Sequence, residues 1–317
     1  MVAPGPVDWS EGPPTMEHWQ MAIRTWADAW ALPGLPMPEA YRRAPSPAHG
    51  RHLVTSRSSK GTLLAWLEIE TLPGQSAALR GVAKASAEAM ADAALDRAWA
   101  EVLGWLRNRD VRRVWSGGGM AHLWPGFPAR SRGEDAWLQE RGFTEAGRTW
   151  DMVARDLQAT AWQIPASRDG VTFSLAEAHD ASAALDWLTH AFPGRWAVEA
   201  RDVLQGQWPG SHLLLGRDGE EVVAFALLHQ PGSAWTWRWQ GECARPAAMG
   251  PLGVAQYRRG QGLGLRLMDA GLSRLREWGA ETTVIDWTTL DAFYGHFGFE
   301  ATWPWTRRVL DMKGAFS

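Results

Sequence analysis

The most informative stretch of the sequence is Val254-Ala255-Gln256-Tyr257-Arg258-Arg259-Gly260-Gln261-Gly262-Leu263-Gly264. A short apolar segment here breaks into alternating glycines, and an amphipathic helical pattern begins at Leu265. Glycines let the main chain approach a ligand closely, and the start of a helix directs N–H groups and the positive end of its dipole at an anion. The stretch therefore predicts a backbone cradle for a pyrophosphate.

The elements around this loop follow from local patterns. The apolar positions of the helix recur at spacings of three, four and three, and Gly279 is suited to end it. Residues 282–287 are β-branched and aromatic, which favours a strand. The loop is therefore expected between two strands, at a helix start. The apolar helix positions are Leu265, Met268, Leu272 and Leu275.

Spacing separates three kinds of phosphate loop. A Walker loop would end in Gly-Lys-Ser/Thr, and a dinucleotide fingerprint would have the spacing G-x-G-x-x-G near the start of a βαβ unit. Arg259 to Gly264 instead read R-x-x-G-x-G, which resembles the coenzyme A loop of the GNAT superfamily of acyltransferases. Asp291 to Phe299, with Tyr294 ahead of Gly298-Phe299, is similar to the ending of that family.

The resemblance implies that the chain transfers an acetyl group from acetyl-CoA directly to a primary amine. It assigns Tyr294 as the acid that protonates the leaving thiolate, with a buried core tyrosine as the alternative. Asp286, Glu242 and His229 are candidates for the general base, and a surface or hydrogen-bonded role is the favoured alternative for each. The coenzyme A residues that the resemblance implies are Gly253, Val254, Arg259, Gly260, Gln261, Gly262, Leu263, Gly264 and Leu265.

An internal repeat sets the expected architecture. Residues 135–143 match residues 291–299 at Asp, Ala, Gly and Phe without a gap, and similar strand and helix patterns precede both copies. The resemblance makes this a mixed α/β fold of two tandem GNAT-like modules, each a mostly antiparallel sheet flanked by helices. The expected parts are a flexible tail (1–17), an N-terminal module (18–157), a linker (158–170) and a C-terminal acetyltransferase domain (171–317).

The first module lacks both signatures. It has only Arg80-Gly81 where the glycine loop is expected, and Leu138 stands where the second half has Tyr294. Residues 117–133 form an insertion that resembles a loop of tandem members of the superfamily. The first module is therefore expected to be a degenerate copy.

Two aromatic segments are candidates for the acceptor site. Trp235, Trp237 and Trp239 alternate with polar residues, which predicts a strand over 235–240 with the three indoles on one face. That face is either a wall of the acceptor site or, as we favour, a packed side of the sheet. Residues 192–196 lie where the family's early helices border the acceptor.

Composition excludes several classes of function. The net charge of -3 provides no basic field for nucleic acid and no polybasic membrane patch. Cys243 is the only cysteine and the histidines form no metal-ligand pattern, so neither a disulfide nor a bound metal is expected. No apolar run is long enough for a membrane span. A cytoplasmic monomer or homodimer is expected, whose acceptor is a small-molecule or peptide amine.

Two rival interpretations stay open. The chain could retain the fold and coenzyme A binding but serve as a non-catalytic sensor or assembly protein, which the absence of an obvious base favours. Alternatively, both modules could bind an acyl-CoA.

Overall fold

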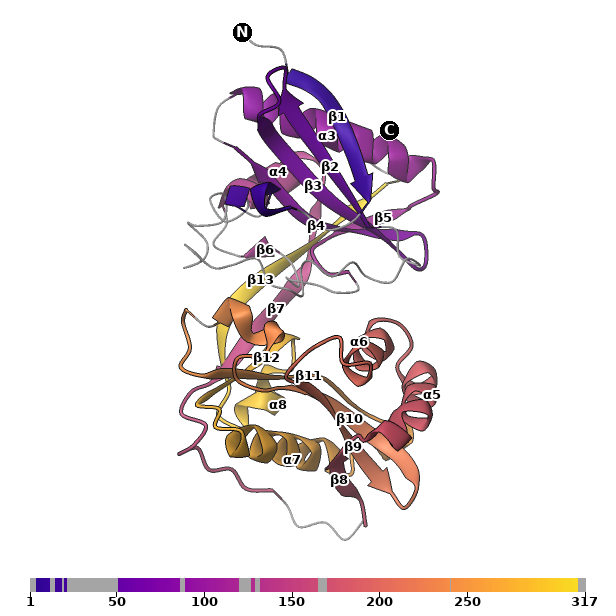
Figure 1. Cartoon of the computed structure of the whole chain (residues 1–317), viewed down its shortest axis with the longest axis vertical. Helices are drawn as coiled ribbons and strands as arrows, with labels where there is room; N and C mark the ends of the chain where they lie inside the picture. The colour runs from indigo at the N-terminus through magenta and orange to yellow at the C-terminus, as the bar shows by residue number, and fades with distance from the viewer. Residues whose placement is uncertain are drawn as a thin grey trace. The chain divides into compact units, whose positions relative to one another are not determined.

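The strands and helices form two units in the computed structural model (Figure 1). The structure describes residues 4–11, 15–18, 20–21, 51–85, 89–119, 127–128, 132–164, 170–239 and 241–312. The first unit comprises Met1–Thr149 together with Pro304–Ser317, and the second comprises Trp150–Trp303. Two strands, β7 (Thr144–Ala154) and β13 (Glu300–Asp311), contain residues of both units.

The first unit is a mostly antiparallel sheet. Strands β1 to β4 pair antiparallel in sequence order, β4 pairs parallel with β5, and β5 pairs antiparallel with the end of β13. Alternation along β3 places Leu67 and Ile69 in the core under α3, whereas Glu68 and Glu70 alternate with them. The elements are β1 (Pro4–Glu11), β2 (Arg51–Ser58), β3 (Leu63–Leu72), β4 (Ser76–Lys84), α3 (Ala89–Arg107), β5 (Arg113–Ser116), β6 (Phe127–Pro128) and α4 (Arg132–Glu140).

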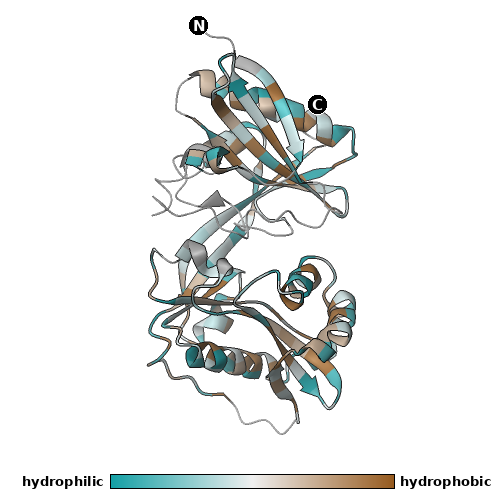
Figure 2. Ribbon diagram, viewed as in Figure 1, coloured by the Kyte–Doolittle hydropathy of each residue, from teal (hydrophilic) through white to brown (hydrophobic). Residues whose placement is uncertain are grey.

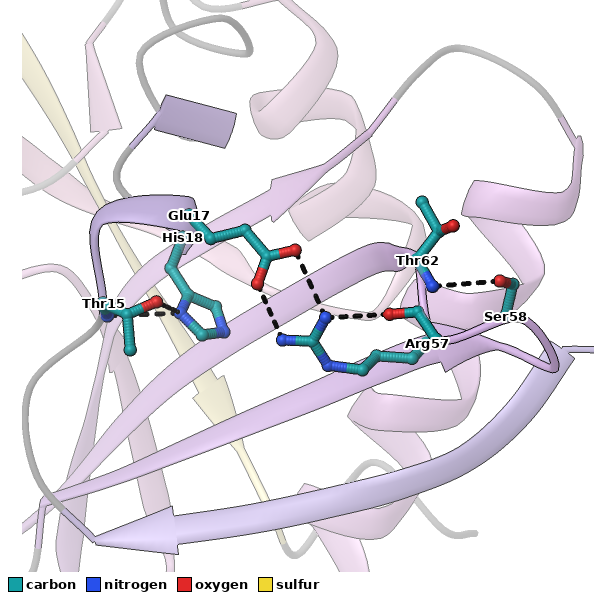
Figure 3. A network of polar contacts seen from close by, with 7 residues as sticks. Thr15, Glu17, His18, Arg57, Ser58 and Thr62 are labelled. Atoms are coloured by element: carbon teal, nitrogen blue, oxygen red, sulfur yellow. Dashed lines mark hydrogen bonds and ion pairs between the residues drawn. The ribbon is translucent and has the colours of Figure 1, made fainter.

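The N-terminal residues do not form the expected free tail. β1 pairs with β2 along its length. In Figure 3, Glu17 pairs with Arg57, and the Thr15 N–H and hydroxyl lie 3.2 and 2.6 Å from His18 Nδ1. The His18 ring is buried edge-on against Trp66, and burial lowers its pKa. The flexible tail was predicted because this segment is rich in Pro and Gly, which favour loops. The sequence does not reveal that β2 can pair with the segment and make it a strand.

The second unit has the same mostly antiparallel construction. Strands β8 to β11 pair antiparallel in sequence order, β11 pairs parallel with β12, and β12 pairs antiparallel with β7. The elements are β8 (Thr172–Leu175), η1 (Ala178–Asp180), α5 (Ala181–Ala191), α6 (Arg195–Leu204), β9 (Ser211–Asp218), β10 (Glu221–His229), η2 (Ala234–Trp239), β11 (Pro246–Val254), η3 (Gln256–Arg258), α7 (Leu263–Glu277), β12 (Thr282–Thr288) and α8 (Asp291–Gly295).

Helices cover both faces of this second sheet (Figure 1). On β10, Ala224, Ala226 and Leu228 lie in the core with the apolar stripe of α7. Phe225 lies on the opposite face, with Trp187 of α5 and Trp196 of α6. Figure 2 shows the resulting pattern, with hydrophobic residues gathered along the strands and mixed residues on the helices. β10 is therefore buried on both sides, which explains its near-continuous apolar sequence.

The predicted fold class is confirmed, with differences in particular elements. The helix after the glycine loop begins at Leu263 instead of Leu265, because Gly262 already has the left-handed conformation of its cap. The strand predicted over 235–240 is wrong: residues 234–239 form the 3-10 helix η2. Alternation with period two favours a strand, but the segment folds as a 3-10 helix that packs Trp239 with Val284 and Trp303.

The predicted linker is docked on the second unit in its described part, 158–164. Gln158 donates to the carbonyls of Arg276 and Ala280, and Trp162 Nε1 donates to Asp269 Oδ1 at 2.7 Å. The second unit therefore begins before this segment, at Trp150. The end of the last strand belongs to the first unit, where Val309 pairs with Trp115. None of the helices in the described part of the chain is long and apolar enough to cross a membrane.

Candidate active site

The candidate site lies where β11 and β12 stop pairing. Their parallel register covers three residue pairs and ends at Ala248 and Val284. β11 then bulges at Gly250-Pro251, since three steps along β11 match two along β10. β12 bulges as well, because three steps from Ile285 to Thr288 match two along β7. Bulges bend a strand and re-aim its side chains, so two of them side by side open the sheet.

The bulge in β12 is held by a specific contact. Trp287 has φ +48, a left-handed conformation that is unfavourable for a bulky residue. Its N–H donates to Asp151 Oδ1 at 3.1 Å, and Asp151 is fully buried. Side chains of a regular strand alternate between its two faces, whereas at this bulge Ile285, Asp286 and Trp287 all line the same pocket.

A pocket of about 510 Å³ fills the space between the two strands. Tyr294 and Phe293 of α8 border it from one element, and Phe192, Arg195 and Trp196 border it from another part of the chain. The predicted acceptor segment 192–196 therefore does contribute to the pocket. The remaining lining residues are 249–254, Arg259, Gly264 and 285–290.

The glycine loop presents unused backbone donors. In the part of the chain that the structure describes, no protein acceptor receives the N–H groups of residues 260–264. Gly260 and Gly262 have φ +76 and +77, and a side chain added at either would meet open space. Five consecutive free amides at the start of a fifteen-residue helix form an anion-binding concavity.

Of the other predicted coenzyme A residues, one lacks a free amide and three lie on the pocket. Leu265 is less suitable than predicted, because its N–H already donates to the Gly262 carbonyl at 3.1 Å. Gly253 and Val254 do lie at the end of β11, on the pocket. Arg259 lines the pocket and donates from Nε to the Val254 carbonyl at 3.1 Å, so it joins the loop to the strand end.

Tyr294 lies in the pocket wall and is 5 % exposed. Burial raises the pKa of its hydroxyl, the nearby Asp286 carboxylate raises it further, and a hydrogen bond with Thr288 opposes both. The phenol therefore keeps its proton at neutral pH. A neutral hydroxyl in a pocket wall can donate a proton to a developing anion.

The three candidate bases differ in their positions. Glu242 accepts a hydrogen bond from Trp303 Nε1 at 3.0 Å and does not line the pocket. His229 is buried with Nδ1 2.7 Å from Ser211 Oγ and Nε2 3.1 Å from the Gly250 carbonyl, and burial lowers its pKa to about 4. Asp286 alone of the three lines the pocket.

Comparison with known proteins identifies a family for part of the chain. Residues 181–299 match the model of the acetyltransferase (GNAT) family. This part of the chain belongs to the GNAT family. The match includes the glycine loop, both bulged strands and Tyr294. A search of curated protein sequences finds no relative.

Solved GNAT structures share the fold of nearly the whole chain. A glucosamine N-acetyltransferase region of a fungal multi-domain β-N-acetylglucosaminidase is 18 % identical with a TM-score of 0.76 over 98 % of this chain, which spans 38 % of that protein. A tandem GNAT protein from the clavulanic acid pathway is 18 % identical with a TM-score of 0.58, covering 97 % of this chain and 99 % of that one. A GCN5-related N-acetyltransferase from Sphaerobacter thermophilus is 15 % identical with a TM-score of 0.60, covering 98 % and 97 %. At these sequence identities, the likeness shows a shared fold and nothing further.

One buried acid of the GNAT domain was missed from the sequence. Glu199 on α6 is 5 % exposed and accepts a hydrogen bond from Arg195 Nη1 at 2.9 Å. Burial raises its pKa to about 7, Arg195 opposes the rise, and Asp286 and Asp202 add to it. The pair is separated by four residues on one helix, which alone suggests an ordinary surface ion pair.

Two tryptophans of η2, Trp235 and Trp239, are packed in the core. Trp239 is 1 % exposed in a cluster with Val284 and Trp303, and Trp235 stacks on His229 with ring centroids 5.0 Å apart. Neither lines the main pocket, and the side chain of Trp237 lies outside the described residues. Burial raises the pKa of Cys243, which keeps its thiol protonated. The described residues contain no cluster of potential metal ligands.

Proposed function

We propose that the chain transfers an acetyl group from acetyl-CoA to a primary amine, and that the second unit performs the transfer. The observation that carries the proposal is the combination of five free amides at the start of α7 with a neutral, buried Tyr294 in the adjoining pocket. The family match adds the expectation of acetyl-CoA as the donor. No metal is required for this chemistry.

Each part of the site has a task in acetyl transfer. The N–H groups of residues 260–264 bind the pyrophosphate, and the free edge of β11 near Gly253 and Val254 pairs with the pantetheine arm. Acetyl-CoA supplies the thioester that the amine attacks. Tyr294 donates its hydroxyl proton to the departing sulfur, and its position in the pocket wall holds that proton ready.

The first unit differs at the matching position. β4 and β5 are also parallel, and their pairing ends at Leu79 and Ser116. Beyond that point Arg80 pairs with Glu70 at 2.5 Å and with Glu68 at 3.3 Å, all three buried. A side chain at Gly119 would overlap Glu70 and lie 2.6 Å from Arg80. This packing supports a single acyl-CoA site per chain.

The acceptor end of the pocket combines aromatic and acidic groups. Phe192, Trp196 and Trp287 form its aromatic lining, and Asp286 supplies a carboxylate. Aromatic faces and a carboxylate attract a protonated amine. An amino sugar is the first acceptor to test, since the fungal region with the same fold is described as a glucosamine N-acetyltransferase.

Calorimetric titration with acetyl-CoA tests the proposal. We expect one site per chain and no binding to the Gly262→Asp variant, which places a negative charge where the pyrophosphate is expected. Gly206→Asp is the matched control, because Gly206 has φ +71 and equally open surroundings outside the loop. Two sites would contradict the assignment to one unit.

Turnover separates an enzyme from a sensor. We expect acetylation within a panel of primary amines that includes glucosamine, putrescine and a lysine-containing peptide. Binding of acetyl-CoA without acetylation of any amine would favour the non-catalytic alternative. Absence of binding at millimolar acetyl-CoA would contradict both interpretations.

A further inference from the structure

A second, smaller cavity adjoins the main pocket. It is lined by Glu199, Leu227, His229, Trp235, Gly250 and Pro251, among others. Gly250 and Pro251 also line the main pocket. The bulge of β11 therefore forms a shared wall, with Glu199 on its far side.

Asp286 approaches the same wall from the main pocket. Its Oδ1 lies 4.0 Å from the position that a Cβ on Gly250 would occupy. Arg195 connects the two sides, because it lines the main pocket, donates to Glu199 Oε1 at 2.9 Å, and holds its guanidinium carbon 4.8 Å from the centre of the Trp287 ring. Asp286 and Glu199 thus lie on the two sides of the wall at Gly250, and the charge of Asp286 acts on Glu199.

We propose that Asp286 and Glu199 act as a coupled pair, in which Asp286 binds the acceptor's ammonium group in the pocket and Glu199, held by Arg195 behind the bulge, takes up the proton that the ammonium group releases. This inference rests on the proposed function. Asp286 contacts the acceptor and is the catalytic residue of the pair. Glu199 does not contact the acceptor and receives the proton by way of Asp286.

The charges around Glu199 suit this task. It faces Arg195 and Asp202 from its own helix, Asp286 from β12 and His229 from β10. His229 stays neutral with both ring nitrogens engaged, so it does not compete for the proton. The desolvation that raises the pKa of Glu199 to about 7 lets it gain and lose a proton near neutral pH.

The proton balance of the step is simple. An N–H bond of the ammonium group breaks and an O–H bond forms on the carboxylate pair, which leaves the nitrogen lone pair free to attack the thioester carbon. The C–S bond then breaks, and the sulfur takes the Tyr294 proton. The attacking nitrogen loses its second proton, which restores the Tyr294 hydroxyl. The proton held by Glu199 leaves to solvent.

The pH profile of the Glu199→Gln variant tests the pair. In the parent, kcat/KM for the best amine of the panel should rise with an apparent pKa near 7 and then level off. In the variant, the pH dependence of kcat/KM should follow only the ionisation of the free amine. The value of kcat/KM should therefore keep rising until the pH reaches the pKa of that amine. The deficit should be about 10-fold to 100-fold at pH 7 and shrink by pH 9.

Three controls separate a proton role from a structural one. Glu199→Asp keeps a carboxylate and should recover part of the rise in kcat/KM near pH 7, which is called the limb near pH 7 below. Glu220→Gln removes an exposed turn carboxylate and should leave the profile unchanged. The acetyl-CoA affinity of Glu199→Gln should match that of the parent.

The outcomes distinguish this inference from the proposed function. An active parent whose pH profile is only scaled down in Glu199→Gln, with the same shape, overturns the coupled pair and leaves the acetyltransferase assignment intact. A parent that binds acetyl-CoA but acetylates no amine overturns both. Loss of the limb near pH 7 together with its partial recovery in Glu199→Asp supports the pair.

Discussion

Replacing Glu199 with Gln should stabilise the protein at alkaline pH. The unfolded chain loses the Glu199 proton above its ordinary pKa of 4.5, whereas the folded chain holds it until about 7. The free energy of unfolding therefore falls as the pH rises from 4.5 to 7, and the full cost is present above 7. At about 1.4 kcal/mol per pH unit, ionising Glu199 costs roughly 3 kcal/mol. Gln resembles the protonated acid and avoids this cost.

Thermal unfolding of the parent and the variant at pH 4, 6 and 8 measures the effect. For a unit of this size, roughly 3 kcal/mol corresponds to a difference in Tm of about 6–12 °C. We expect the Tm of Glu199→Gln minus that of the parent to increase by this amount between pH 4 and pH 8. Comparing the change with pH cancels the contribution of the titrating groups that do not interact with Glu199.

The control is Glu220→Gln, whose exposed position in the β9–β10 turn should make the difference independent of pH. Identical pH dependence of the parent and Glu199→Gln would refute the reasoning, because it would mean that Glu199 ionises in the folded chain as it does in the unfolded one. A variant that is less stable at pH 8 than at pH 4, relative to the parent, would show that the Arg195 pair outweighs desolvation.

Two further substitutions probe the pocket. Tyr294→Phe should lower kcat by about 10²–10⁴-fold without changing the affinity for acetyl-CoA, since it removes only the acid. Tyr257→Phe, at an exposed tyrosine, is the control and should leave kcat unchanged. Equal kcat values for Tyr294→Phe and the parent would exclude the acid role. Gly253→Ala places a Cβ 2.6 Å from Phe192 Cζ, so it should cost about 1–3 kcal/mol of stability and raise the KM for acetyl-CoA. Gly104→Ala in α3 is its control, since that Cβ would meet open space far from the loop in sequence, and equal effects of the two would contradict this account.

The parts of the site that sequence predicts are those with local causes. The glycine loop, its helix and the short helix carrying Tyr294 each depend on backbone conformations that a few neighbouring residues impose, such as the left-handed φ of Gly260 and Gly262. The repeat likewise predicted that Leu138 and Tyr294 occupy matching places, and both side chains are buried. Local chemistry is legible because neighbours in sequence are neighbours in space.

The parts that sequence does not predict depend on distant partners. Glu199 and Arg195 have the spacing of a surface ion pair, and only the packing of α6 against β9 and β10 makes the acid buried. The bulge at Trp287 needs Asp151, which is 136 residues away, to accept its N–H. The tryptophans of η2 alternate like a strand, yet Trp235 and Trp239 are packed by residues from other elements. Such partners cannot be inferred from spacing along the chain.

The comparison of the two units indicates why only one should carry a site. Both contain a parallel strand pair that ends after three or four residues, so the sheet opens in both. In the second unit, glycine, proline and aromatic residues border the opening and leave a pocket. In the first, the buried pairs of Arg80 with Glu68 and Glu70 lie beside the end of the strand pair, where a side chain added at Gly119 would overlap Glu70. Removing one partner of a buried pair strands a charge at a cost of about 3–5 kcal/mol, so a ligand that entered there would have to offset that cost before it gained any binding energy.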